Sequence, residues 1–228
     1  MGKTPQKIPS QALSHRSHRT SARAPNPMSY RKLNHLYPEQ ISQTLLDELA
    51  RHDVYDLPLD EYCRLAQDRW QDFFKTANAS DTVTLLECCL FQNPLTVLID
   101  RHNADPQLAR QHIEQITKIV SALNPLVIYL HPKNVTDALQ HVRAERPKEW
   151  ADFVTWYLTG QAYGKVHHLS GFDGVIQFYS MRQKLEVEIL RSLPVQHLVL
   201  EHSGNEWKQC EEEMFSFVNL FWNRDLST

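Results

Sequence analysis

The sequence predicts a mixed α/β domain, built on a parallel β-sheet with helices on both of its faces. Three short apolar runs, at residues 82–87, 126–130 and 196–201, are separated by long segments in which apolar residues recur at helical spacing. Strands that are apolar on both faces are typical of parallel sheets covered by helices on each side. We find no internal repeat and no second domain in the sequence.

A basic segment precedes this domain. Seven of the 24 Lys and Arg residues lie within residues 1–32, where no acid occurs, so the remaining residues hold 17 bases against 27 acids and a net charge of about −10. Residues 1–29 are rich in Ser, Pro, Arg, Gln and Ala, and such a composition buries too little surface to offset the entropy of ordering. We therefore expect a disordered tail over 1–29 and the α/β domain over 30–228.

Two other interpretations of the tail carry less weight. An organellar transit peptide shares its Arg- and Ser-rich, acid-free composition, but four prolines before Met28 break any amphipathic helix. A nucleic-acid-binding arm is disfavoured because the Lys and Arg residues of the tail are dispersed and are not interleaved with aromatic residues.

Cysteine usage and hydropathy indicate the compartment. None of the four cysteines forms a C-x-x-C pair, and the adjacent Cys88 and Cys89 would point to opposite faces of a strand. This pattern favours a reducing, cytoplasmic setting and disfavours a zinc site. No apolar run approaches the about 20 residues that span a bilayer, so we expect no membrane association.

The expected elements follow the apolar pattern along the chain. Asn134 and Asp137 suit the start of a helix, and Asn124-Pro125 suits the end of another. The expected helices cover residues 41–49, 59–77, 108–123, 135–142, 150–158, 172–193 and 207–221.

Ligands of open parallel sheets bind at the carboxyl ends of the strands. That rule selects Glu87, which ends the first apolar run. A carboxylate in this position is costly unless it is hydrated, paired or bound to a metal, so Glu87 is a candidate to hold Mg²⁺ or to accept a substrate proton. A carboxylate that simply emerges at the rim of the sheet fits its position equally well.

Arg143 and Arg146 stand three residues apart at the end of a predicted helix. Clustered arginines on a mobile polar segment clamp developing charge in phosphate-transfer enzymes. Without further context a solvated helix end is favoured, in which Glu145 and Glu149 neutralise these bases.

Several short segments, taken in order, carry a resemblance to a known family. They include Glu87-Cys-Cys-Leu-Phe-Gln-Asn93 and Arg143-Ala-Glu-Arg-Pro-Lys-Glu-Trp150, and the others lie at residues 123–130, 163–165, 171–174 and 203–207. Over about residues 53–222 their order and spacing resemble P-loop kinase-like proteins distantly related to thymidylate and other nucleoside monophosphate kinases.

The resemblance implies a three-layer P-loop NTPase-like fold, with ATP and Mg²⁺ as cofactors and a nucleotide or small phosphate acceptor as partner. Glu87 would then lie near Mg²⁺ and substrate, and Cys88 stands where those kinases carry an Arg, which leaves the substrate type open. The other implied site residues are Gln92 and Asn93 for the acceptor, Arg143 and Arg146 as lid arginines, and Ser203, Gly204 and Asn205 near the nucleotide base.

The amino end departs from the family pattern. The family has a central apolar strand followed by G-x-x-x-x-G-K-[ST], a loop whose backbone N–H groups and Lys bind the phosphates. Here only Gly2, Lys3 and Thr4 match the end of that motif, so the central strand is missing or replaced within this sequence. One hypothesis is that the natural reading frame begins upstream of Met1, which the DNA upstream of codon 1 tests.

Three functions follow as alternatives. The first is a kinase-like phosphotransferase or NTPase that is impaired as written and binds ATP weakly or not at all. The second is a non-catalytic remnant or interaction protein that keeps the fold, and the incomplete phosphate loop favours it. The third uses the tail as a nucleic-acid-binding or targeting arm. The sequence leaves the substrate and the oligomeric state open.

Overall fold

The computed structural model describes residues 39–51, 53–80, 82–202 and 207–225 of the 228-residue chain. The tail predicted over residues 1–29 lies outside this part. The chain divides into two compact units, a smaller one (Met1–Leu57 with Asn219–Thr228) and a larger one (Pro58–Val218). Within the part described, no helix combines the length and the apolar character that crossing a bilayer requires.

The described elements of the smaller unit are short. Helix α2 (Gln43–Arg51) confirms the helix predicted over residues 41–49, and a single 3-10 turn, η1 (Val54–Asp56), follows it. Asp53 caps that turn, because its carboxylate accepts a hydrogen bond from the Tyr55 backbone N–H.

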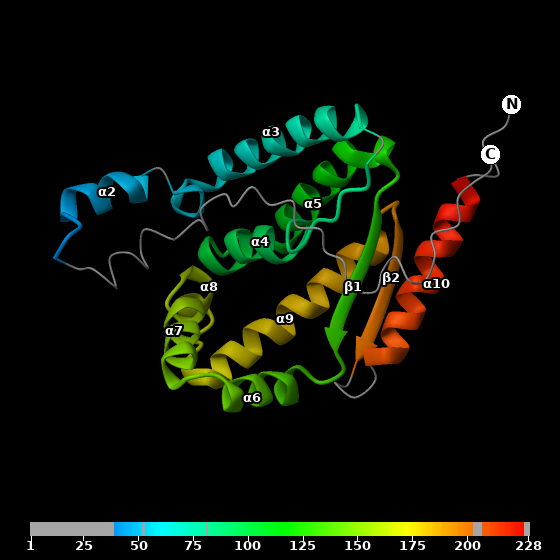
Figure 1. Ribbon diagram of the computed structural model, residues 1–228. Coiled ribbons are helices and arrows are strands. Elements are labelled where there is room, and N and C mark those ends of the chain that lie inside the picture. Colours follow the sequence, from blue (N-terminus) through cyan, green and yellow to red (C-terminus); the bar gives the residue numbers. More distant parts are fainter. Residues whose placement is uncertain (1–38, 52, 81, 203–206, 226–228) are drawn as a thin grey trace, which may run out of the picture. The chain divides into compact units, whose positions relative to one another are not determined.

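The larger unit is a mixed α/β structure in which helices predominate (Figure 1). It confirms the general α/β prediction and every predicted helix of this unit within a few residues, and it adds α4, the π-helix η2 and α8. The elements are α3 (Leu59–Asn78), α4 (Gln92–Leu95), η2 (Thr96–Arg101), α5 (Pro106–Val120), η3 (Ser121–Leu123), β1 (Leu126–Pro132), α6 (Val135–Glu145), α7 (Lys148–Thr159), α8 (Ala162–Val166), α9 (Gly171–Ser192), β2 (Gln196–His202) and α10 (Trp207–Asp225), the last of which continues beyond this unit.

Strands β1 and β2 form a two-stranded parallel sheet, the one sheet found in the part of the chain described. Their register runs from Leu126 opposite Gln196 to Pro132 opposite His202. The Lys133 backbone N–H extends the pairing by one bond, donating to the His202 carbonyl at 3.0 Å. Two of the three predicted strands, and their parallel direction, are therefore confirmed.

The third predicted strand, over residues 82–87, is wrong. These residues form neither strand nor helix, and Leu85 is 95% exposed and Val83 71% exposed. An apolar, β-branched run favours an extended backbone, but it becomes a buried strand only where another strand offers its edge. The sheet of the described residues consists of β1 and β2, and this segment pairs with the outer edge of neither strand.

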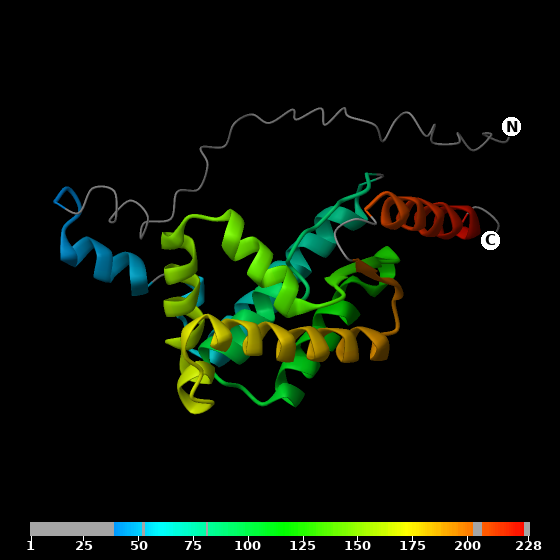
Figure 2. The same ribbon diagram turned by 90° about the horizontal axis from the view of Figure 1, so that it is seen from below.

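Helix α9 is the centre of the core, with the sheet on one side of it and other helices around it. It packs against α5, α6 and α7 along its length (Figure 2), and Tyr129 and His131 of β1 contact Glu186 and Gln183 on it. Its fully buried apolar side chains recur at helical spacing, and each contributes roughly 1.5–3 kcal/mol by burial. They include Val175, Phe178, Ile189 and Leu190.

Local signals in the sequence explain where the elements begin and end. The Asn134 side chain accepts hydrogen bonds from the backbone N–H groups of Thr136 and Asp137 at 2.9 and 3.2 Å, which confirms the predicted start of α6. Asp105 caps α5 in the same way. Asn124 has a left-handed backbone with φ of 51°, which ends the η3 turn and sends the chain into β1.

Candidate functional site

A buried polar cluster lies between the sheet and the two helical segments that face it. We call it the Arg182 cluster, and its members come from η2, β1 and α9. All five are buried or half-buried, although charged side chains are rarely buried without a partner. They are Thr96, Asp100, Tyr129, Arg182 and Glu186.

Arg182 and Glu186 stand one turn apart on α9 and form a buried ion pair. Arg182 Nε lies 3.1 Å from Glu186 Oε1, outside hydrogen-bond geometry, and Arg182 Nη1 donates to Thr96 Oγ1 at 3.2 Å. The guanidinium also lies over the Tyr179 ring, 4.6 Å from its centroid. These contacts hold one cation in a fixed place beneath the sheet.

Tyr129 of β1 joins this pair to the sheet. Its hydroxyl donates to the other carboxylate oxygen of Glu186. Burial raises the pKa of Glu186, while Arg182 and the Tyr129 hydroxyl act in the opposite direction. Burial, and then the charge of Glu186, raises the pKa of Tyr129. The hydroxyl therefore stays protonated and keeps donating to Glu186.

Asp100 is the deepest member of the cluster. Its side chain is 0% exposed, and neither carboxyl oxygen has a hydrogen-bond partner among the described residues. Burial raises its pKa to about 7, and the charge of Arg182 opposes that rise. Asp100 belongs to the π-helix η2, in which the His102 N–H donates to the Val97 carbonyl five residues back. Such π-helical turns occur frequently at functional sites.

The segment that carries the predicted acceptor residues adjoins this cluster. Cys88 Sγ donates to Gln92 Oε1 at 3.4 Å, and the Asn93 backbone N–H donates to the Cys88 carbonyl at 3.0 Å. Cys88 has a φ of 65°, an uncommon conformation for a residue with a side chain. Burial, then Glu87 and Cys89, raise the pKa of the Cys88 thiol, and the charge of Arg182 lowers it. The segment meets the cluster at Thr96, whose hydroxyl donates to the Gln92 carbonyl at 2.7 Å.

His131 and Gln183 extend the polar network toward the carboxyl end of β1. The Gln183 amide nitrogen lies 2.6 Å from His131 Nδ1 and donates to the Pro132 carbonyl at 3.3 Å. The His131 ring lies near that of Tyr129, with 5.7 Å between the ring centroids. Hydrogen-bonding groups from α9 and β1 therefore meet where ligands of parallel sheets bind.

The predicted site residues are partly brought together. Glu87 and Gln92 are exposed, and Asn93 is half-buried, all within one segment that reaches the cluster through the bond from the Thr96 hydroxyl to the Gln92 carbonyl. Glu87, however, ends an exposed irregular segment and not a strand. No group of three or more His, Cys, Asp or Glu side chains in the part described is arranged to hold a metal ion. Mg²⁺ at Glu87 would need ligand phosphates and water to complete its coordination.

The two predicted lid arginines lie apart from this segment in sequence and differ from each other. Arg143, in the last turn of α6, is exposed and has its guanidinium 4.7 Å from the centroid of the Phe172 ring. Arg146 follows the end of α6 with an extended backbone, so the two side chains do not share one helix face as their spacing predicted. Gly2, Lys3, Thr4, Ser203, Gly204 and Asn205 lie outside the described residues.

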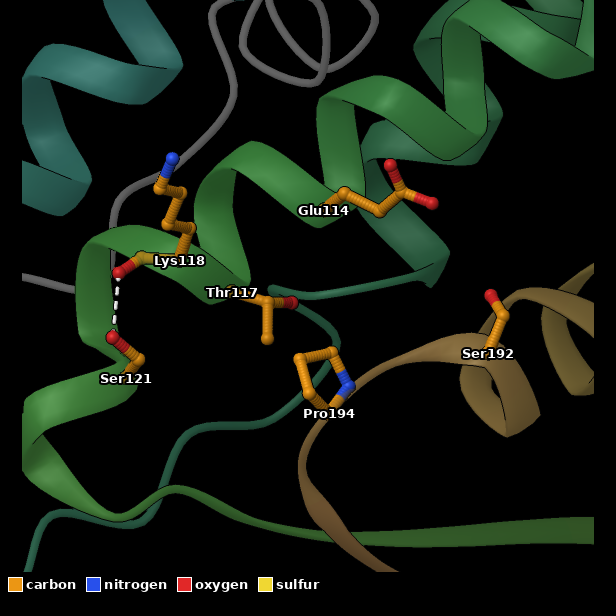
Figure 3. A pocket seen from close by; sticks show the side chains of 6 residues that line it. All are labelled: Glu114, Thr117, Lys118, Ser121, Ser192 and Pro194. Atoms are coloured by element: carbon orange, nitrogen blue, oxygen red, sulfur yellow. Dashed lines mark hydrogen bonds between the residues drawn. The ribbon is translucent and has the colours of Figure 1, made fainter.

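A hollow of about 420 Å³ lies at the opposite end of the strands (Figure 3). Its lining residues precede β1 and β2 in the chain, and they are Glu114, Thr117, Lys118, Ser121, Ser192 and Pro194. The hydroxyls of Thr117, Ser121 and Ser192 already donate hydrogen bonds to backbone carbonyls. Figure 3 shows the bond from the Ser121 hydroxyl to the Lys118 carbonyl. The hollow therefore offers little directed chemistry, and the Arg182 cluster is the better candidate site.

Sequence reasoning missed the four titratable members of the cluster, although one signal was present. Arg182 and Glu186 fall on the apolar stripe of α9 together with Phe178 and Ile189. A charged pair at i and i+4 within an apolar stripe indicates a buried ion pair, because the alternative is two unpaired buried charges. Asp100 and Tyr129 carried no comparable signal, since each is one polar residue in an apolar run.

The arrangement combines an accessible carboxylate at Glu87, an accessible amide at Gln92 and a buried, charge-assisted network behind them. It can orient a hydrogen-bonding ligand at the carboxyl end of β1. Comparison with protein-family models, curated proteins and solved structures finds no match to this chain.

Proposed function

We propose that this chain is a P-loop kinase-like nucleotide-binding protein that retains the acceptor side of its site and is impaired in phosphotransfer. The observation that carries the proposal is the gathering of polar side chains from η2, β1 and α9 at the carboxyl half of β1. In open parallel sheets this is where substrates bind. The cysteines, all free, fit a cytoplasmic protein of this class.

The acceptor side is supported by accessible groups on a fixed frame. Gln92 and Glu87 are exposed, and the turn between them is held by the Cys88 contact to Gln92 and by the Asn93 backbone hydrogen bond. Behind the turn, Arg182 is fixed by Glu186 and Thr96. Side chains held in this way can bind a ligand with little loss of conformational entropy.

The impairment is supported by the placement of Glu87. A carboxylate that holds Mg²⁺ in phosphotransfer has to be positioned closely, because small displacements are costly for the rate. Here Glu87 follows an exposed segment that no strand anchors. ATP and Mg²⁺ remain the cofactors we propose, with Gly2, Lys3, Thr4 and residues 203–205 on the nucleotide side and Arg143 and Arg146 as lid arginines.

A non-catalytic interaction protein is the second candidate, and one observation favours it. Val83, Leu85 and Leu86 are exposed together on the segment that was predicted to be a strand. Contiguous exposed apolar residues can form an interaction surface.

A ligand panel separates the two candidates. We would measure thermal unfolding with nucleosides and nucleoside monophosphates at millimolar concentration, using the wild type, Gln92→Ala and the control Gln111→Ala on the exposed face of α5. The proposal predicts that at least one compound raises the Tm of the wild type and the control, and that Gln92→Ala loses most of that rise. If no compound stabilises the wild type, the non-catalytic candidate replaces the proposal.

A further inference from the structure

Asp100 is a buried carboxyl group to which the proposed function assigns no role. Its carboxyl group is fully buried, and both oxygens are without hydrogen-bond partners within the described residues. An isolated carboxylate in such a place is far more costly than a neutral acid. Asp100 must therefore either be paired with a cation or carry a proton itself.

The cation beside Asp100 is already engaged. Arg182 acts on the charge of Asp100, but its Nε lies 3.1 Å from Glu186 and its Nη1 donates to Thr96. Both acids are buried, at 0% exposure for Asp100 and 5% for Glu186. Arg182 reaches η2 at Thr96, four residues before Asp100, and its one positive charge acts on both buried carboxyl groups, so it neutralises one of them.

The elements around Asp100 bring other titratable groups, and none replaces Arg182. The η2 segment is packed against α4, α5 and α8, and Arg182 reaches it from α9. Helix α4 carries no titratable side chain. Burial lowers the pKa of His112 on α5, so its imidazole stays neutral, and burial raises the pKa of Tyr163 on α8. The other titratable groups that η2, α5 and α8 carry are Arg101, Arg110, Glu114, Lys118 and Lys165, with His102 at the end of η2, and Arg182 alone opposes the effect of burial on Asp100.

We propose that Asp100 holds a proton below neutral pH, and that on losing it Asp100 competes with Glu186 for the single guanidinium of Arg182. When the Asp100 hydroxyl loses its proton to solvent, the new carboxylate draws Arg182 away from Glu186. Glu186 also accepts a hydrogen bond from the Tyr129 hydroxyl, and Arg182 also donates one to the Thr96 hydroxyl. Movement of Arg182 toward Asp100 therefore changes both of these hydrogen bonds. Proton loss is thereby coupled to the polar network at the carboxyl half of β1.

The sign of the pH dependence follows from the direction of the shift. Burial raises the pKa of Asp100 to about 7 in the folded chain, above its ordinary value of 3.8. Between these values the folded state binds more protons than the unfolded state, so stability falls as the pH rises from about 4 to about 7. If Asp100 acts alone, the folding equilibrium constant falls by up to about tenfold for each pH unit in this range.

Carbon-13 NMR of the side-chain carboxyl groups tests the proposal on the full chain. The wild type, Asp100→Asn and the control Asp152→Asn, which changes an exposed acid on α7, would be titrated between about pH 5 and pH 8.5. We expect one carboxyl resonance with a midpoint near neutral pH that is absent in Asp100→Asn and present in the control. A resonance assigned to Glu186 by Glu186→Gln should shift with the same midpoint, as coupled sites do.

The proposal is overturned if the Asp100 resonance titrates at the ordinary pH of an exposed aspartate, or if the Glu186 resonance does not follow it. Should Asp100→Asn fail to fold, denaturant unfolding of the wild type decides. A fall in stability from about pH 5 to about pH 7 supports the proposal, and constant or rising stability over that range overturns it.

Discussion

Arg182 Nε lies 3.1 Å from Glu186 Oε1, one turn along the same helix, and the two side chains are only 10% and 7% exposed. This pair ties α9 to β1 through Tyr129 and to η2 through Thr96. A buried pair of this kind adds little net stability relative to an apolar core, but removal of one partner leaves a charge that water cannot reach. The structure around the candidate site therefore depends on both partners being present.

The first prediction concerns this dependence. Arg182→Met should lower the free energy of unfolding by about 3–5 kcal/mol, because Glu186 then remains buried without its cation. Arg110→Met is the matched control, since Arg110 of α5 pairs with Glu188 of α9 in a contact whose Glu188 side chain is largely exposed. It should cost about 1 kcal/mol or less. Equal losses in urea unfolding would contradict the buried-pair account.

A second prediction addresses coupling within the pair. The double variant Arg182→Met with Glu186→Leu should be more stable than Arg182→Met alone, because the second change removes the uncompensated carboxyl group. We expect the two single effects to be non-additive by about 1–3 kcal/mol in a double-mutant cycle. Additive effects would show that the two side chains do not act as a unit.

A third prediction tests whether residues 82–87 are an exposed segment, as in the structure, or a buried strand, as the sequence predicted. Leu85→Ala should change the free energy of unfolding by no more than about 0.5 kcal/mol, because Leu85 is 95% exposed. Leu98→Ala, the same change at a fully buried position of η2, should cost about 2–5 kcal/mol. If Leu85→Ala costs as much as Leu98→Ala, residues 82–87 form the buried strand that the sequence predicted.

Two glycines give a fourth prediction. A Cβ on Gly164 would lie 2.5 Å from the Thr159 carbonyl oxygen, which is backbone and cannot rotate away, so Gly164→Ala should cost about 1–3 kcal/mol or more. Gly171 has φ of 59° with no atom within 4 Å of such a Cβ. Gly171→Ala should therefore cost only the strain of the left-handed backbone, about 1–2 kcal/mol. Thermal and urea unfolding would rank the two, and a smaller loss at Gly164 would contradict the close approach.

Apolar periodicity was sufficient to predict the long helices and the two strands that pair. Helix α3 and strand β1 were expected close to their observed bounds, and Asn134 was expected at the start of α6. These elements are set by residues within one or two turns of each other, so the local sequence determines them.

The predictions that failed or were missed depend on distant partners. Residues 82–87 have the composition of a strand, but pairing is decided by an edge supplied from elsewhere in the chain. The Arg182 cluster joins η2, β1 and α9, which are far apart in sequence, and no local pattern places Asp100 beside Arg182. Glu87 was selected because it ends the run that was predicted to be a strand, and since that run forms no strand, the strand-end rule does not support Glu87 in this structure.

The central claim is that this chain is a kinase-like protein that retains the acceptor side of its site and is impaired in binding ATP. Calorimetric titration of the full chain with Mg-ATP tests this claim most directly. We predict no saturable heat, or a Kd in the millimolar range. A micromolar Kd for Mg-ATP would contradict the account, because it would require an intact phosphate-binding site in this chain.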